Sequence, residues 1–253
     1  EAGEYIVQAS HGPTHGRAQE SLVATSGEES VVHLVVPREV DTTGWISLDS
    51  HLHAEPSFDS GVKLDKRVGS VVAEGVDFAI ATDHDVVTDY QPWINRLGLN
   101  DRLGTAPGVE LSTLESGHFI AFPLRYDALD IPAHGSPDWA CQNGQSILDR
   151  LSDLFEEGKD GVRLLAHPRD GFTGYISQLG VNPFDLSRKD LARPKLEVDL
   201  AALTGNSDSE AQLLEYEGNN PLFRQASCDF DGIEVFTSKR FDLIRTPTNE
   251  ETV

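Results

Sequence analysis

The sequence lacks methionine altogether, and it holds only two cysteines among its 253 residues. A natural full-length product begins with methionine, so we expect this chain to be a processed or excised piece, and no signal peptide is visible in it. Cys141 and Cys228 fit either one disulfide in an exported protein or two buried thiols. The sequence leaves the location open, with an exported or periplasmic one favoured over the cytoplasm.

Basic residues and long apolar runs are also scarce. No run of about 18 apolar residues exists, so no segment is expected to span a membrane. Against 42 acidic residues there are only 20 lysines and arginines, which leaves a formal charge of −22. Such a surface repels phosphate backbones, so binding of a nucleic-acid groove is not expected. The length allows one large domain, or one domain with a smaller module.

The first 41 residues have the composition of β-strands. Three short β-branched segments, 6–10, 20–26 and 30–40, are separated by glycine and proline. We therefore predict that residues 1–41 are the end of a small β module, a partial sandwich. Residues 42–253 are expected to form a second domain.

Strand and helix patterns alternate after residue 43. Strands are predicted at 45–50, 76–82, 104–113, 118–124, 162–168 and 231–238, and helices at 64–75, 89–99 and 144–158. Residues 183–220 are polar and irregular and are interpreted as an inserted loop region. Alternation of this kind predicts an α/β barrel or a related closed sheet.

Five histidines and one glutamate lie at the boundaries of these predicted strands. They are His51, His53, His84, Glu110, His118 and His167. The carboxyl ends of parallel strands meet on one face of a barrel, so most of these side chains are expected to share a pocket. His118 lies at a strand start, so its strand has to run antiparallel or curl back for it to join them.

The pair His51 and His53 has a direct physical interpretation. Residues i and i+2 of an extended chain point to the same side, so the two imidazoles converge on one point. Neutral imidazole is a good ligand for Zn, Mn and Fe, and a carboxylate such as Glu110 can bridge two ions. A single histidine after a strand is more often structural than a ligand, but the joint placement of all six residues favours a metal centre.

Other catalytic patterns are not found. No GxSxG elbow, glycine-rich phosphate loop or CxxC pair occurs in the sequence. A metal-bound hydroxide is therefore the better candidate nucleophile, because a divalent ion lowers the pKa of water to about 7. His11, His15 and His134 are interpreted as surface residues, and His33 as a strand residue.

Five segments, taken in order, carry a family resemblance. DSHLHAEPSFDSG, ATDHD, GVELSTLESGHFIAF, LLAHPR and FDGIEVF resemble the PHP (polymerase and histidinol phosphatase) superfamily. GWISLDSHLHA followed by AEGVDFAIATDHDVVTDY is most similar to its CehA/McbA-type, carbamate-hydrolase-like branch. The resemblance covers roughly residues 42–240. It implies a distorted (β/α)7 PHP barrel, preceded in that branch by a β module.

The resemblance also implies two or three divalent ions, Zn, Mn or Fe. His51 and His53 would hold one ion with Glu110, a second would be held by Glu110, His118 and His167, and His84 would hold a third with Asp59. The usual Ser-Asp-Gly motif is replaced here by the sequence Phe58-Asp59-Ser60-Gly61. Asp49 and Asp83 would orient the neighbouring histidines without binding the ions themselves.

Two further residues are candidates for binding an anionic group of a substrate. Arg169 follows His167 in the HPR sequence, and Tyr175 lies beyond it. The alternative for Arg169 is a structural ion pair with one of the carboxylates.

The family carries a late Asp-x-His after the IEVF strand, and this chain does not. GNSDSE resembles the family's GNSDSH, but Glu210 stands where histidine belongs, and Asp208 lies before that strand. We expect the domain to be incomplete at its C-terminus. If the protein is cleaved, a companion C-terminal polypeptide should bring the missing Asp and His.

Two functions follow from these interpretations. The first is a metal-dependent hydrolase that uses a metal-bound hydroxide on phosphoester, ester or carbamate/amide bonds of a small-molecule substrate. The alternative is a metal-binding regulatory or binding module without turnover. The ligand residues favour the enzyme, and the absent late Asp and His favour the module.

Overall fold

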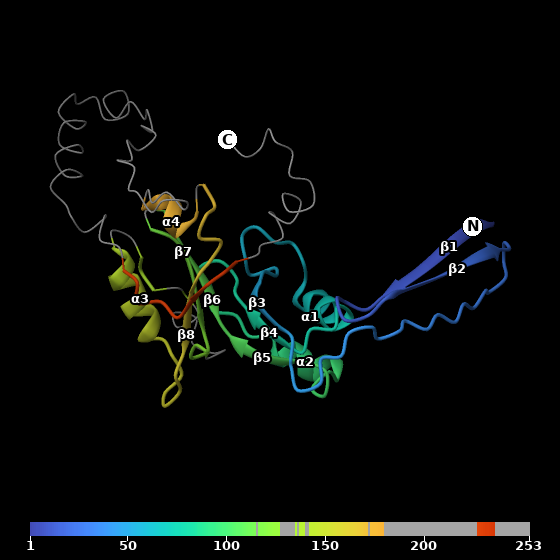
Figure 1. The fold of residues 1–253 in the computed structure, drawn as a ribbon, viewed down its shortest axis with the longest axis horizontal. Coiled ribbons are helices and arrows are strands. Elements are labelled where there is room, and N and C mark those ends of the chain that lie inside the picture. Colours follow the sequence, from blue (N-terminus) through green and yellow to red (C-terminus); the bar gives the residue numbers. More distant parts are fainter. Residues whose placement is uncertain are drawn as a thin grey trace, which may run out of the picture. The chain divides into compact units, whose positions relative to one another are not determined.

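The computed structural model describes residues 1–114, 116–126, 135, 137–139, 142–171, 173–179 and 227–235. They fall into two compact units, whose elements are labelled in Figure 1. Unit 1 contains Glu1–Ala81 and Asp89–Ala106, and unit 2 contains Thr82–Thr88 and the described residues from Pro107 onward. The described residues are a mixed α/β structure with three separate sheets. The domain boundary at residue 41 and the (β/α)7 barrel remain predictions.

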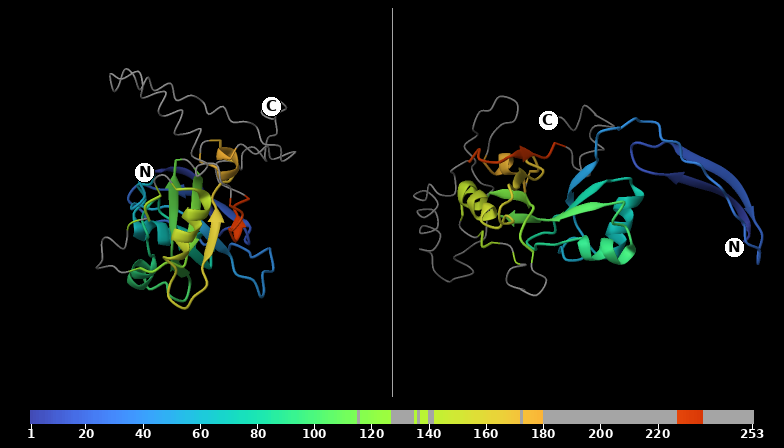
Figure 2. Two further views of the ribbon diagram at one scale, coloured as in Figure 1. Left: turned by 90° about the vertical axis from the view of Figure 1, so that its left-hand side faces the viewer. Right: turned by 90° about the horizontal axis from the view of Figure 1, so that it is seen from below.

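Unit 1 begins with an antiparallel hairpin of β1 (Gly3–Ser10) and β2 (Arg17–Ala24). Figure 2 shows these strands as a long curved ribbon. The first two predicted strands are therefore confirmed. The third, over residues 30–40, is wrong: residues 31–37 form no strand, and Val35 is 84% exposed. Its β-branched residues satisfy strand propensity, but a strand also needs a hydrogen-bonded neighbour and a buried face.

A parallel strand–helix–strand element follows in unit 1. It consists of β3 (Leu48–Leu52), α1 (Leu64–Ala73) and β4 (Phe78–Ala81), and β3 pairs with β4 in parallel, as predicted. The helix ends before Gly75, whose φ of 70° is a left-handed conformation that glycine adopts at little cost.

The second half of this layer is α2 (Gln91–Leu97) and β5 (Gly104–Pro107), and the sheet order is β3-β4-β5. Buried side chains of both helices, Val68 and Val71 of α1 and Ile94 of α2, form one core with Ala79 of β4 and with Leu103. The apolar spacing along α1 thus buries the face that the sequence predicted.

Asp77 joins the starts of β3 and β4. Its Oδ2 accepts hydrogen bonds from the Ser47 backbone N–H (2.8 Å) and from Ser47 Oγ (2.9 Å). These bonds hold the pKa of Asp77 below its ordinary value. A lowered carboxyl pKa stabilises the fold above the unfolded-state value of about 3.9, and this contribution is lost as the pH falls through the folded-state value.

We therefore expect Asp77→Asn to lower the free energy of unfolding at neutral pH by about 0.5–1 kcal/mol, a modest effect because the residue is exposed. The difference from the wild type should shrink below about pH 4. Urea unfolding at several pH values measures it. The exposed Asp101→Asn serves as the control, and a deficit that stays constant with pH would contradict the ionic origin.

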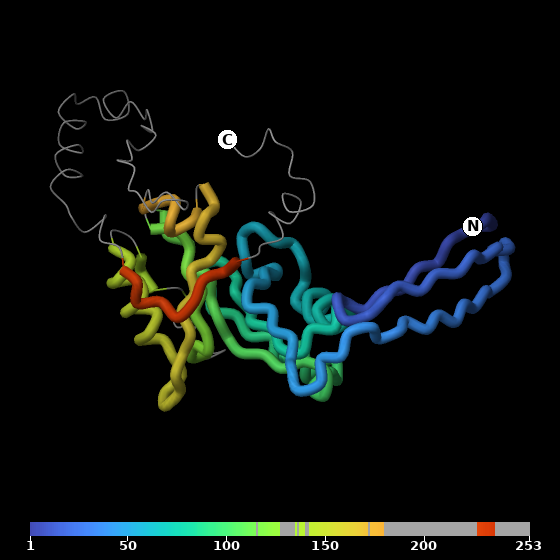
Figure 3. The backbone as a smooth tube through the Cα atoms, in the orientation of Figure 1, coloured from blue at the N-terminus to red at the C-terminus, as the bar shows by residue number. Residues whose placement is uncertain are grey.

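Unit 2 contains a sheet in the order β6-β7-β8-β9. The strands are β6 (Val109–Thr113), β7 (Gly117–Phe122), β8 (Val162–Leu165) and β9 (Gly232–Ile233). Strand β7 runs antiparallel to β6 and β8, and β9 pairs in parallel with β8, beside which its short segment is seen in Figure 3. Of the two arrangements expected for the strand of His118, the antiparallel one is thus the one observed.

The strand predicted over 104–113 is two strands in two sheets. β5 ends at Pro107, which has no N–H to donate to a sheet, and β6 begins at Val109. Gly108 instead exchanges backbone hydrogen bonds with Thr88, at 3.2 and 3.3 Å. The break assigns β5 to unit 1 and β6 to unit 2.

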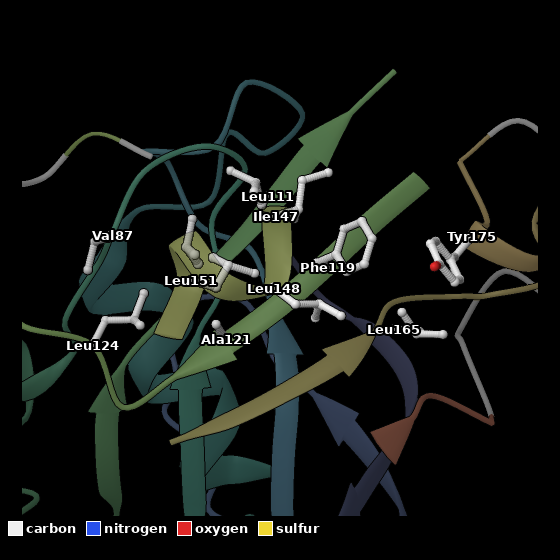
Figure 4. Close-up of a cluster of buried hydrophobic side chains, with 11 residues drawn as sticks. Val87, Leu111, Phe119, Ala121, Leu124, Ile147, Leu148, Leu151, Leu165 and Tyr175 are labelled. Carbon is white, nitrogen blue, oxygen red and sulfur yellow. The ribbon is translucent and has the colours of Figure 1, made fainter. Parts of the chain in front are cut away.

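One face of the unit 2 sheet packs into an apolar core. Figure 4 shows Leu111 of β6 and Phe119 and Ala121 of β7 on the same side of the sheet as α3 (Gly144–Ser152). They form one core with the helix residues Ile147, Leu148 and Leu151. Asn143 begins this helix, and its side chain accepts the Ser146 N–H at 2.9 Å. The helix ends at Ser152, so Leu154 and Phe155 pack from beyond it rather than from its predicted last turn.

Some predictions fall on residues that are not described. The loop region 183–220, with Asp208 and Glu210, lies outside the described residues, as do His134 and Cys141. Cys228 is exposed. The pairing of the two cysteines therefore stays a prediction. In the described part of the chain, no helix has the length and apolar character needed to cross a membrane.

Candidate metal centre

Glu110 lies at the centre of a histidine cluster in unit 2. Its side chain has no exposure to solvent, and three imidazoles surround its carboxylate. Oε1 lies 2.9 Å from His118 Nδ1 and 2.9 Å from His167 Nε2, and Oε2 lies 3.2 Å from His84 Nδ1. Burial of a carboxylate is costly unless opposite charge or hydrogen bonds compensate, and the three imidazoles are the groups that can supply either one or hold an ion beside it.

Strand register explains why Glu110 and His118 meet. In the β6–β7 pair, His118 lies opposite Ser112 and Glu110 lies opposite Ile120. Glu110 and His118 are therefore diagonal neighbours on one face of the sheet, within reach of long side chains. The residues that follow them in sequence, Leu111 and Phe119, point to the opposite face and into the core.

His84 reaches Glu110 through a backbone bridge. His84 forms an isolated parallel β-bridge with Glu110, in which the Asp85 N–H donates to the Glu110 carbonyl at 2.9 Å. The Glu110 N–H donates in return to the carbonyl of Asp83, a fully buried residue, at 3.2 Å. His84 Nδ1 also contacts Ser112 Oγ at 2.5 Å. The ATDHD segment thus behaves as a short strand beside β6.

The backbone of His167 is strained. Its φ of 26° is left-handed, a conformation that costs a non-glycine residue about 1–3 kcal/mol. Two hydrogen bonds hold it there: its N–H donates to Glu234 Oε2 at 2.7 Å, and its carbonyl accepts the Asp170 N–H at 2.8 Å. Strain that the surroundings maintain in this way is typical of functional sites.

The donor set fits a divalent ion. Imidazole nitrogens and carboxylate oxygens bind zinc at about 2.0–2.2 Å, so two ligands of one ion lie roughly 3 Å apart. The nitrogen–oxygen distances around Glu110 have this size. One ligand atom each from His84, Glu110 and His118 lies within 4.8 Å of the others. The two oxygens of Glu110 face different histidines, which suits a carboxylate that bridges two ions.

A second group of predicted ligands lies in unit 1, at the end of β3. The rings of His51 and His53 have centroids 5.0 Å apart. His53 Nδ1 lies 3.0 Å from Asp59 Oδ1, which also accepts a hydrogen bond from Ser57 Oγ at 2.7 Å. Asp49 Oδ1 accepts the His51 N–H at 3.1 Å. Asp49 therefore holds the backbone of the pair.

Some predicted sets join residues of different units. The ion shared by His51, His53 and Glu110, and the one shared by His84 and Asp59, remain predictions for this reason. Within unit 2, the structure adds His84 to the set around Glu110, where the sequence had predicted only His118 and His167.

The two candidates for anion binding have different outcomes. Arg169 is exposed and forms no ion pair with any of the described residues, so its role as a substrate contact stays a prediction. Tyr175, at the start of α4 (Tyr175–Gln178), is a core residue. Its hydroxyl donates to the Ser227 carbonyl (3.0 Å) and accepts the Ser227 N–H (2.7 Å), and burial raises its pKa. Tyr175 is therefore structural, which corrects its predicted role.

Several residues around the site were not predicted from the sequence. They are Ser112, Asp170, Thr173 and Glu234, which contact the histidines, and Asp85, which accepts the Ser112 N–H. The position of Ser112, two residues after Glu110 on one strand, was the one local signal available. No protein-family model matches this sequence, and no curated protein matches it either. The contacts of Glu110 with His84, His118 and His167 are the observations that support a metal site.

Proposed function

We propose that this protein is a metal-dependent hydrolase that acts on phosphoester, ester or carbamate/amide bonds. The observation that carries the proposal is the fully buried Glu110 carboxylate, which has three imidazole nitrogens within 3.2 Å. A carboxylate in that position needs hydrogen bonds or positive charge beside it, and a divalent ion supplies the charge. Three imidazoles with one carboxylate are a ligand set for Zn, Mn or Fe.

Each residue of the cluster has a distinct task in this proposal. His118 and His167 would share one ion with Glu110 Oε1, and His84 would bind toward Oε2. When bound, such ions lower the pKa of water to about 7 and polarise the bond to be broken. The strained backbone of His167 and the bridge at His84 keep the imidazoles directed at Glu110 before any ion arrives.

The substrate class is supported by the resemblance alone. The PHP superfamily favours phosphoesters, and its CehA/McbA-type branch favours carbamates or amides. Arg169, two residues beyond His167 and exposed, is the proposed contact for an anionic group. A guanidinium donates two parallel hydrogen bonds to phosphate or carboxylate oxygens.

The test combines metal analysis with two substrates. We expect purified protein to contain Zn, Mn or Fe, and to hydrolyse p-nitrophenyl phosphate or an aryl carbamate when Mn or Zn is added. Removal of metal by a chelator should abolish turnover, and Arg169→Ala should raise KM more than it lowers kcat. Bound metal without turnover on either substrate would favour the binding module. Protein that binds no divalent ion would overturn the proposal.

A further inference from the structure

The ring of His167 has a polar contact at each nitrogen. Nε2 lies 2.9 Å from Glu110 Oε1, and Nδ1 lies 3.2 Å from Thr173 Oγ1. A neutral imidazole carries one N–H, so only one of these nitrogens can donate. Which of them donates decides which one can bind an ion.

Asp170 settles the direction of the second contact. Its Oδ1 accepts the Thr173 backbone N–H at 3.1 Å and lies 3.0 Å from Thr173 Oγ1. An ionised carboxylate only accepts hydrogen bonds, so the Thr173 hydroxyl donates its single hydrogen to Asp170. Toward His167 the same hydroxyl can then only accept. The hydrogen of the ring must therefore be on Nδ1.

This direction leaves the lone pair of Nε2 pointing at Glu110. In the neutral ring, a lone pair and a carboxylate oxygen repel each other at 2.9 Å unless a proton or a metal ion lies between them. We infer that Asp170 and Thr173 are positioning residues that hold His167 as the Nδ1–H tautomer and direct Nε2 to a metal ion. The inference rests on the proposed function, because it assigns this nitrogen to the ion of the hydrolase centre.

The backbone of Thr173 also contacts a second predicted ligand, His118. Its carbonyl accepts the His118 N–H at 2.9 Å. Asp170 in turn donates its own N–H to the His167 carbonyl at 2.8 Å. Asp170 and Thr173 therefore hold the backbones of both histidines that face Glu110 Oε1. Outer partners of this kind fix the orientation of a ligating histidine and raise its basicity.

The test replaces the hydroxyl and keeps the shape. Thr173→Val removes the acceptor for Nδ1, Thr173→Ser retains it, and Asp170→Asn removes the carboxylate that sets its direction. The tautomer of His167 is measured by NMR on isotope-labelled histidine, in metal-free protein at a pH where the ring is neutral. Zn affinity is measured separately by competition with a chelator. Thr105→Val, which loses a hydroxyl bond to Ala79 in unit 1, is the matched control.

We expect the wild type, Thr173→Ser and Thr105→Val to show the Nδ1–H tautomer. Thr173→Val and Asp170→Asn should show a mixture, with Zn affinity reduced by about 10–100-fold. An Nε2–H tautomer in the wild type, or an unchanged tautomer in Thr173→Val, would overturn the inference. Wild-type protein that shows the Nδ1–H tautomer but binds no Zn would instead refute the proposed function and leave the tautomer control standing.

Discussion

Substitution of Glu110 by glutamine should remove the metal from the centre more completely than any single histidine substitution. The carboxylate contacts three imidazoles through two oxygens, and it is the fully buried negative charge of the cluster. An amide keeps the shape, but it supplies a weaker ligand atom and no charge. We expect metal affinity to fall by more than about 100-fold, beyond the effect typical of an outer partner.

Elemental analysis and chelator competition measure this loss, with His84→Ala and His118→Ala as the histidine comparisons. The matched control is Glu156→Gln, which removes a charge that pairs with Lys159 at the surface. Thermal unfolding of the metal-free proteins checks that Glu110→Gln still folds. Equal metal content in Glu110→Gln and the wild type would refute the bridging role of the carboxylate.

The largest expected effect on stability is at Leu148. Its side chain is fully buried in the core of unit 2, beneath the sheet that carries Glu110 and His118 (Figure 4). Leu148→Ala removes three carbon atoms and leaves a cavity that a close-packed core fills only in part. We expect the free energy of unfolding to fall by about 2–5 kcal/mol.

Denaturant unfolding followed by circular dichroism measures this change. Asp149→Ala, at an exposed position of the same helix, should change stability by less than about 0.5 kcal/mol. The two adjacent substitutions thus compare the buried and exposed faces of α3. A loss at Leu148 no larger than that at Asp149 would mean that α3 does not pack on the sheet as described.

Much of the fold follows from local patterns in the sequence. The apolar spacing of Leu64, Val68 and Val71 predicts α1, and the glycine at residue 75 predicts where it ends. The two-residue period of an extended chain predicts that His51 and His53 point to the same side, and the centroids of their rings lie 5.0 Å apart. These features depend on neighbours a few residues away, so the sequence reveals them directly.

Other features depend on contacts that the sequence does not display. The segment 30–40 has strand composition, but it forms only an isolated bridge, between Arg38 and His15, and no strand. The contact of His84 with Glu110 requires knowledge of which strand neighbours β6. Tyr175 was interpreted as a substrate contact because it follows His167 closely in the sequence. Its hydroxyl instead bonds to Ser227, more than fifty residues away, and the sequence does not display that contact. Long-range pairing decides all three cases.

The alternation in β6 and β7 has a consequence for the fidelity of folding. A slip of one residue in either strand would exchange its two faces, since side chains alternate strictly. Such a slip in β6 would turn the Glu110 carboxylate into the apolar core and Leu111 toward the histidines. In β7 it would do the same with His118 and Phe119. Chains with a shifted register would therefore lose hydrophobic contacts and ligand geometry together. A bound ion would stabilise the native register alone.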